Sequence, residues 1–466
     1  MSYTNRKKND KAIKLLIYVF IIALIASVAF VFLSPTFEKN KPKTSLENEI
    51  FWNLKTPLKV NFSDDNEIKS YVITYNDGKK NVILDTKIIS KSKGSLDLNI
   101  IAPKADIMYQ PKEVILKLEV FDTSKWNFFK GNSLVKEIKV KVDKVRPIAN
   151  VITNSYLIRQ GGSAIVIAEI KDENLKDFYI SFNNTDRFEL IPFYKKNFYF
   201  AIIAWPIVRD TFESVNLVAI DEARNETITK VPLYIKSLKQ KVDDIKISEK
   251  FIDKVSKHVL KKSGYELPDD NSEIFIKENR DLREQNVITI KEVVTNYMNK
   301  DKISKFKLKA FRRLSSGKKF AGFGERRHYF YDNEKIDEAW HLGMDWASVK
   351  KAKIFTTNAG KVIYNDYLGI YGNTVIIDHN YGLSSLYAHT SRTSVDLNDK
   401  VRAGQQIANT GSTGAVFGDH LHFGVLVQGI EVNPKEWMDK NWIKVNVINT
   451  IAKAKKVIDS KWNKEQ

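Results

Sequence analysis

Six of the seven histidines in this 466-residue chain lie between His328 and His422, and the chain contains no cysteine. Without cysteine there can be no disulfide, iron–sulfur cluster, cysteine nucleophile or thiolate zinc site, so a metal site must use His, Asp or Glu. The first 257 residues contain no histidine. Metal-dependent or histidine-dependent chemistry is therefore expected near the C-terminus.

One pair of these histidines, His420 and His422, is separated by a single residue. On a strand the two point to the same face, while Leu421 and Phe423 point to the core. Two imidazoles placed side by side in this way can serve one metal-centred site. A lone His-x-His pair is about as often a surface accident as a ligand pair, so the pair alone does not decide the question.

The wider pattern is more specific than the pair. An x-His-x-Gly-x-Asp segment (340–345), a Tyr-Ala-His strand end (387–389) and a Gly-Asp-His-Leu-His-Phe segment (418–423) follow one another within one hundred residues. Fourteen of the chain's twenty glycines lie in the same region, which predicts tight turns between short strands. We therefore expect a compact all-β domain over residues 304–437.

This domain resembles the LytM/lysostaphin-type zinc metalloendopeptidases, which cleave peptide crosslinks of bacterial peptidoglycan. About a quarter of the chain carries the resemblance. The matching segments are FGER at 323–326, HLGMDWA at 341–347, YGNTVIIDHNYGLSSLYAHT at 371–390, VRAGQQIANTGSTGAVFGDHLHFGVLV at 401–427 and VNP at 432–434. The resemblance implies the duplicated hybrid motif of that family and one zinc ion per catalytic domain.

Carried over by position, the resemblance makes His341, Asp345 and His422 the zinc ligands. It makes His389 and His420 catalytic histidines that do not bind the metal. Two His and one Asp leave a fourth zinc position for water, as a catalytic zinc requires. We expect His420 to be the general base and His389 to orient the water or stabilise the oxyanion, although the sequence leaves open which of the two takes the proton.

The sequence departs from the family pattern in two places near these residues. Asp419 replaces the proline that commonly precedes His-Leu-His, and its carboxylate is expected to raise the pKa of the adjacent imidazoles or to support them by hydrogen bonding. Residues 348–352 replace a glycine-containing turn after Asp345, which leaves the edge of the substrate groove uncertain. The remaining histidines, His258, His328 and His379, are predicted to have no functional role.

A second class of function is a catalytically silent regulator that activates other wall hydrolases by contact. Some members of the family have lost zinc ligands and act in this way. Because all five positions are present here, the sequence favours the enzyme: a zinc metalloendopeptidase that hydrolyses peptide crosslinks of peptidoglycan during cell-wall remodelling.

The N-terminus predicts a membrane segment. Residues 15–33 contain no charge and, as a helix, span about 28 Å, close to the thickness of the hydrocarbon core. Five Lys and Arg residues within the first fourteen predict a cytoplasmic basic segment, and hence a single-pass inner-membrane protein whose bulk lies in the periplasm or cell-wall space. The alternative is a secreted protein, with Ser27-Val28-Ala29 as a signal cleavage site.

Between the membrane segment and the catalytic domain, the chain is predicted to be mainly β. After a linker (34–48), alternating runs separated by turn residues predict two immunoglobulin-like β-sandwich modules, 49–145 and 146–236. Apolar residues at helical spacing predict a helical connector (237–303), which is also a candidate lid for the site, and a helical C-terminal tail (438–466).

The net charge of +19 raises the question of a polyanionic partner. Lysine is spread along the whole chain among acidic residues, and no nucleic-acid-binding motif is present, so no nucleic-acid partner is expected. The expected partners are peptidoglycan, the inner membrane through residues 15–33, and an envelope protein bound by the two β modules.

Overall fold

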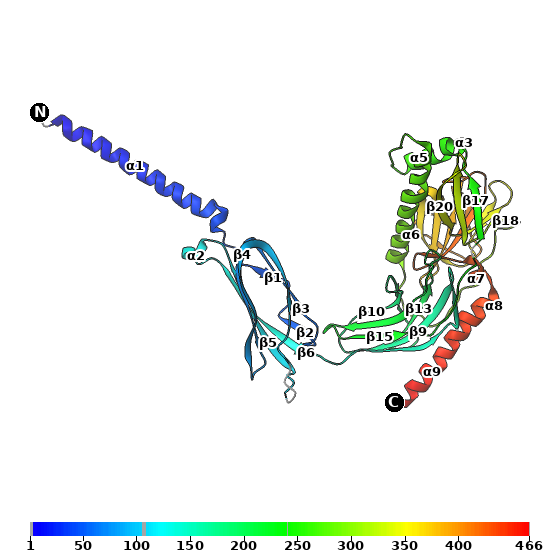
Figure 1. Ribbon diagram of the computed structural model, residues 1–466, viewed down its shortest axis with the longest axis horizontal. Helices are drawn as coiled ribbons and strands as arrows, with labels where there is room; N and C mark the ends of the chain where they lie inside the picture. The colour runs from blue at the N-terminus through cyan, green and yellow to red at the C-terminus, as the bar shows by residue number, and fades with distance from the viewer. Residues whose placement is uncertain (1–2, 105–108, 240, 466) are drawn as a thin grey trace. The chain divides into compact units, whose positions relative to one another are not determined.

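The computed structural model describes residues 3–104, 109–239 and 241–465. It divides into two compact units, one formed by residues 1–146 with 220–225 and the other by residues 147–219 with 226–466 (Figure 1). The predicted site lies wholly within the second unit.

The first unit begins with the long helix α1 (Tyr3–Leu33). Its stretch Lys11–Leu33 has a mean hydropathy of 3.0 and none of its residues is buried, so it is long and apolar enough to cross a membrane. The predicted apolar helix is therefore present near the N-terminus, in a form that both an anchor and a signal sequence share. Ser34 and Pro35 end it, with the 3₁₀ turn η1 (Pro35–Phe37) following.

The rest of the first unit is one antiparallel-rich sheet. Its strands join in the order β1-β3-β5-β6-β2, with β4 paired to β3, so they form one hydrogen-bonded sheet where the sequence predicted the two of a sandwich. The predicted turn at Asn76–Gly78 does join β3 to β4, and Gly78 has a φ of 86° there. The elements are β1 (Lys43–Thr44), β2 (Glu49–Trp52), β3 (Leu58–Asn76), β4 (Asn81–Ile100), β5 (Glu113–Asp122), α2 (Trp126–Phe129) and β6 (Ser133–Val142).

The second unit opens with two four-stranded sheets, ordered β12-β13-β9-β7 and β11-β10-β14-β15. This is the two-sheet arrangement predicted for the second module, and its immunoglobulin-like topology stays a prediction. The strands are β7 (Ile148–Asn154), β8 (Leu157–Arg159), β9 (Ser163–Lys171), β10 (Leu175–Phe182), β11 (Asp186–Glu189), β12 (Ile191–Pro192), β13 (Phe198–Ala204), β14 (Val215–Asp221), β15 (Glu226–Lys230) and β16 (Tyr234–Lys236).

The connector consists of one strand and two helices. Ser248 caps the first helix by accepting a hydrogen bond from the backbone N–H of Phe251, and Gly264 with a φ of 81° follows its end, both as predicted. Each helix contains one π turn. The elements are β17 (Lys241–Lys246), α3 (Glu249–Phe251), η2 (Ile252–Ser256), α4 (Lys257–Lys262), α5 (Asn271–Lys277), η3 (Glu278–Leu282) and α6 (Arg283–Tyr297).

The C-terminal domain is built on an eight-stranded sheet with the order β18-β21-β29-β25-β24-β23-β27, in which β30 also pairs with β29. Smaller sheets, β17-β19-β20 and β22-β28-β26, complete the predicted all-β domain. The strands are β18 (Lys318–Ala321), β19 (Glu325–Tyr331), β20 (Glu334–His341), β21 (Met344–Ala347), β22 (Lys353–Phe355), β23 (Gly360–Leu368), β24 (Gly372–Asp378), β25 (Leu383–Ala388), β26 (Arg392–Thr393), β27 (Lys400–Val401), β28 (Gln406–Asn409), β29 (Leu421–Val427) and β30 (Ile430–Val432), with the 3₁₀ turn η4 (Gly369–Tyr371).

Helices at the C-terminus join this domain to the second module. Trp437 is 1% exposed and donates from Nε1 to the hydroxyl of Ser163 in β9. Further along, Lys461 pairs with Glu169 of the same strand. One apolar core runs through the module, the domain and the tail, so the three form a single packed body. The helices are α7 (Pro434–Met438), α8 (Lys440–Ile443), η5 (Lys444–Ile448) and α9 (Asn449–Glu465).

This junction contains a buried acid, Glu436, which accepts a hydrogen bond from the backbone N–H of Ser163 at 2.8 Å. Burial raises the pKa of Glu436 from 4.5 to about 7. The folded chain thus holds this proton more tightly than the unfolded chain, so its contribution to stability is full below pH 4.5 and is lost as the pH rises through 7.

The unfolding free energy, followed through the thermal midpoint, is therefore expected to fall between pH 4.5 and pH 8. In Glu436→Gln this fall is expected to be smaller than in wild type, by on the order of 2 kcal/mol. Glu278, Glu431 and Asp378 also have their pKa raised to about 7 by burial, so part of the fall remains. The exposed Glu213→Gln serves as the control. Parallel pH profiles for wild type and Glu436→Gln would contradict the assignment.

Candidate metal centre

Three neighbouring strands position the predicted ligands. His341 is the last residue of β20, Asp345 lies in β21, and His422 lies in β29. Asp345 and His422 are direct partners in the antiparallel register of β21 and β29, so pairing of the two strands brings their side chains together. At Gly343, a Cβ would stand 2.5 Å from Nε2 of His422, so only glycine allows the strands to approach this closely.

The side chains of His341, Asp345 and His422 converge on one point. His341 Nε2 lies 3.1 Å from Asp345 Oδ2 and 3.2 Å from His422 Nδ1, and His422 Nδ1 lies 2.8 Å from Asp345 Oδ1. All three residues are buried. Although burial alone raises the pKa of Asp345, the charges and hydrogen bonds of the two histidines hold that pKa well below 3.8.

The donor set and its spacing fit zinc. Zinc bonds of about 2.0–2.1 Å in a tetrahedron place neighbouring donors roughly 3.3 Å apart, close to the three distances above. The carbonyl of Gly322 lies 2.7 Å from Nδ1 of His341 and can only accept a hydrogen bond. Nδ1 of His341 therefore carries the proton, and the lone pair of Nε2 faces the other donors.

His389 and His420 stand beside the donor set. The ring of His389 lies 4.9 Å from that of His420 and 5.7 Å from that of His422, measured between centroids. Nε2 of His420 is 4.0 Å from Oδ2 of Asp345. The structure thus brings all five predicted residues into one cluster.

Backbone carbonyls fix the tautomers of these two histidines. His389 donates from Nδ1 to the carbonyl of Thr413 at 2.8 Å, and His420 donates from Nδ1 to that of Gly418 at 3.1 Å. In the neutral form of each ring, Nε2 is therefore the nitrogen that can accept a proton. Burial lowers the pKa of His389 well below 6.5, with further lowering by the two neighbouring histidines, so His389 stays neutral. Its φ of 59° is unusual for a non-glycine residue.

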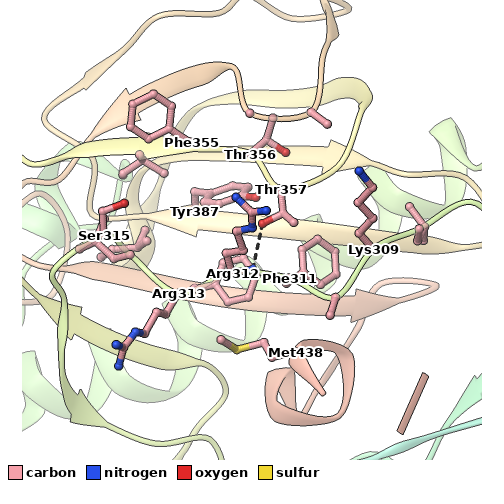
Figure 2. A pocket seen from close by; sticks show the side chains of 18 of the residues that line it. Lys309, Phe311, Arg312, Arg313, Ser315, Phe355, Thr356, Thr357, Tyr387 and Met438 are labelled. Atoms are coloured by element: carbon pink, nitrogen blue, oxygen red, sulfur yellow. Dashed lines mark hydrogen bonds between the residues drawn. The ribbon is translucent and has the colours of Figure 1, made fainter. Parts of the chain in front are cut away.

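The opposite face of β29 is packed against aromatic side chains. Phe423 stacks on Trp346 with a centroid distance of 5.5 Å and meets Phe311 edge-on at 5.7 Å. A cavity of about 730 Å³, lined by Leu421 and Phe423, lies on this face. Figure 2 shows this cavity from close by, with the hydrogen bond from the N–H of Arg312 to the hydroxyl of Thr357. Phe423 therefore faces the core and His422 faces the opposite side of β29, as strand alternation predicted.

A cavity of about 400 Å³ adjoins the metal centre, and we call it the groove. The connector forms one of its walls, because Phe251 packs edge-on against Phe417 at 4.9 Å and Glu278 reaches the same space. The connector therefore borders the site, and its role as a lid stays a prediction. The groove is lined by Asp345, His420, Arg327, Phe320 and Phe417 of the domain together with Phe251 and Glu278 of the connector.

Two residues near the site, Asp419 and Tyr371, have contacts that the sequence did not predict. The carboxylate of Asp419 accepts hydrogen bonds from the N–H of Lys351 and the hydroxyl of Thr410, so it secures the 348–352 turn and does not support the imidazoles as predicted. Tyr371 had no assigned role, yet its ring lies 5.6 Å from that of His422 and its hydroxyl donates to Glu431 at 2.7 Å. Its place in the YGNTVIID segment was the available signal.

The other three histidines lie outside the cluster. His258 is exposed on α4, and His328 faces the carboxylates of Asp244 and Glu338. His379 is buried, with its ring nitrogens bonded to the carbonyl of Ala359 and the hydroxyl of Ser385.

Comparison with known proteins finds a family match in the C-terminal domain. Residues 339–434 match the sequence profile described as peptidase family M23. DD-carboxypeptidase/endopeptidase Mpg of Neisseria meningitidis is 35% identical over 112 residues, 24% of this chain and 25% of that protein. Murein hydrolase activator NlpD of Salmonella dublin is 38% identical over 108 residues, 23% of this chain and 28% of that protein. The chain thus spans about a quarter of the length of these curated relatives.

Among solved structures, the catalytic domain of lysostaphin from Staphylococcus simulans is similar over 27% of this chain and 94% of that chain, at 26% identity and a TM-score of 0.24. The family match at residues 339–434 contains all five clustered residues.

Proposed function

We propose that this chain, which carries a peptidase family M23 domain, is a zinc metalloendopeptidase that hydrolyses peptide crosslinks in bacterial peptidoglycan. The observation that carries the proposal is the complete donor set, with the ligand atoms of His341, Asp345 and His422 within 4.8 Å of one another. Two further histidines with free Nε2 atoms stand beside it. The choice of substrate is supported by the relatives whose names refer to murein and to DD-carboxypeptidase/endopeptidase activity.

His341, Asp345 and His422 would hold the zinc, which when bound supplies a Lewis acid that acidifies water and polarises a carbonyl. His420 lines the groove, so its Nε2 can accept a proton from the attacking water and return it to the departing amine nitrogen. His389 is buried and neutral, and its Nε2 accepts a hydrogen bond that orients the water.

A second candidate function is an activator of other wall hydrolases. The similarity to murein hydrolase activator NlpD supports it, at an identity comparable to that of the endopeptidase relative. The enzyme is favoured because all five residues are present and clustered. An activator would need neither the donor set nor the two histidines with free Nε2 atoms.

We further propose that α1 anchors the chain in the inner membrane as a single-pass protein, with its bulk in the periplasm or cell-wall space. The basic residues before the apolar stretch support this orientation. Secretion after cleavage is the alternative. The two β modules, 49–145 and 146–236, are proposed to bind an envelope protein, and peptidoglycan is proposed as the substrate of the C-terminal domain.

The full chain, loaded with zinc and incubated with crosslinked muropeptides, is expected to release uncrosslinked products detectable by mass spectrometry. Because the proposed reaction needs zinc bound to the three ligands, a chelator is expected to abolish cleavage and added zinc to restore it. No cleavage by the zinc-loaded chain, together with stimulation of a separate wall hydrolase that survives chelation, would favour the activator instead.

A further inference from the structure

The groove contains an arginine, Arg327, for which the sequence predicted no role. Glu325, Arg327 and Tyr329 share one face of β19, and the Arg327 side chain is 22% exposed on the groove. Its Nη2 lies 3.7 Å from Oδ2 of Asp345 and 3.9 Å from Oε2 of Glu325. Both separations exceed a hydrogen bond, and Arg327 donates no side-chain hydrogen bond to any residue in the described ranges.

The two nearby carboxylates have other partners. Glu325 accepts a hydrogen bond from the N–H of Gly322 and lies 3.7 Å from Nζ of Lys241. Asp345 is bonded to the two histidines of the metal centre. A guanidinium carries five N–H donors in a planar fork that matches a carboxylate, so the donors of Arg327 are available to a ligand in the groove.

The other charged groups of the groove are less available. Arg283 donates from Nε and Nη2 to Asn279, and Lys246 is exposed at the rim. Burial raises the pKa of Glu278 to about 7, so this acid is partly protonated at neutral pH. The groove therefore has three cations, on Arg327, Arg283 and Lys246. Its acidic groups are the partly charged Glu278 and the proposed metal ligand Asp345, so the groove is expected to attract an anion.

We propose that Arg327 binds a free α-carboxylate on the residue that supplies the nitrogen of the scissile amide, and so selects substrates that carry one. The inference rests on the proposed peptidase function. Nη2 of Arg327 lies 3.7 Å from Oδ2 of Asp345, a proposed zinc ligand, so we expect the anion that Arg327 binds to lie about one residue, ~4 Å, from the scissile carbonyl. The residue on the carbonyl side of the scissile bond has no free α-carboxylate, because its α-carboxyl group forms the scissile carbonyl. Only the nitrogen side can therefore carry a free α-carboxylate at that distance.

The test compares two crosslinked peptides that differ only in this group, one with the carboxylate and one with the carboxamide. The zinc-loaded full chain is expected to prefer the carboxylate by roughly 10- to 100-fold in kcat/KM, the range for a hydrogen bond to a charged group. Arg327→Gln is expected to lose the preference, mainly through a higher KM for the carboxylate peptide.

Arg326→Gln is the matched control. Arg326 is the next residue of β19, on the opposite face, where it pairs with Glu338. This variant is expected to retain the preference. An unchanged preference in Arg327→Gln would overturn the proposal. So would loss of bound zinc from Arg327→Gln, because Arg327 would then act through Asp345.

Binding separates this inference from the proposed function. His420→Ala retains the three metal ligands and lacks the proposed base, so calorimetric titration of its zinc-loaded form measures affinity without turnover. Tighter binding of the carboxylate peptide, lost in Arg327→Gln/His420→Ala, supports the proposal even if neither peptide is cleaved by wild type. Equal affinity for the two peptides overturns it, whereas absence of cleavage alone counts against the peptidase function.

Discussion

Replacement of His422 with alanine is expected to lower the zinc affinity of the chain by at least about 100-fold and to reduce hydrolysis to the level of the chelated protein. Nδ1 of His422 lies within 3.2 Å of both other ligands, so its removal opens one corner of the donor set. It also leaves the buried carboxylate of Asp345 without its shortest contact. Zinc per chain, measured by mass spectrometry, and cleavage of crosslinked muropeptides check the prediction.

His328→Ala is the control for this variant. His328 belongs to the same domain and contacts two carboxylates, but it lies outside the cluster. It is expected to retain zinc and activity. A thermal melt of His422→Ala with and without zinc distinguishes loss of the metal from loss of the fold. Undiminished cleavage by folded His422→Ala would refute the enzymatic assignment.

The second large effect separates chemistry from metal binding. His420→Ala is expected to keep the zinc content of wild type and to lower kcat/KM by roughly 10²- to 10⁴-fold, the usual contribution of a general base. His389→Ala is expected to behave in the same way with a smaller loss, because His389 orients water and His420 transfers the proton. Stoichiometric zinc combined with steady-state kinetics on one muropeptide tests both variants.

The exposed His258→Ala provides the matched control, with no change expected in either measurement. A variant of His420 or His389 that loses zinc would show that the residue supports the ligands and does not act on the substrate. Equal losses in the two variants would leave the proton transfer shared between them, against the division of roles proposed here.

One part of the candidate metal centre could be predicted from local sequence alone. The His-Leu-His spacing places two imidazoles on one strand face, and the structure has this alternation, with Phe423 packed on Trp346 behind it. The roles of the five residues came from the family resemblance. The tautomers of the histidines could not be predicted from the sequence, because they depend on carbonyls such as that of Thr413, twenty-four residues from His389.

Other features of the site arise from contacts between distant segments, which leave no periodic signal. The parallel pairing of β17 with β19 brings the connector to the groove, and nothing in residues 241–246 indicates that partner. The same holds for the core shared by the second module and the tail, where Trp437 meets Ser163 across 274 residues of sequence. Asp419 was misjudged because its partners, Lys351 and Thr410, lie in separate loops.

The long separation of the ligands has a consequence for how the protein matures. His341 and His422 are 81 residues apart in the chain, and their side chains meet where β21, which follows His341, pairs with β29. Such pairings of high contact order form late, because loop closure must be compensated before they contribute stability. We therefore expect the donor set to be absent until β21 and β29 have paired. If the chain is the proposed zinc hydrolase, we expect it to bind zinc, and to become active, only once these two strands have paired.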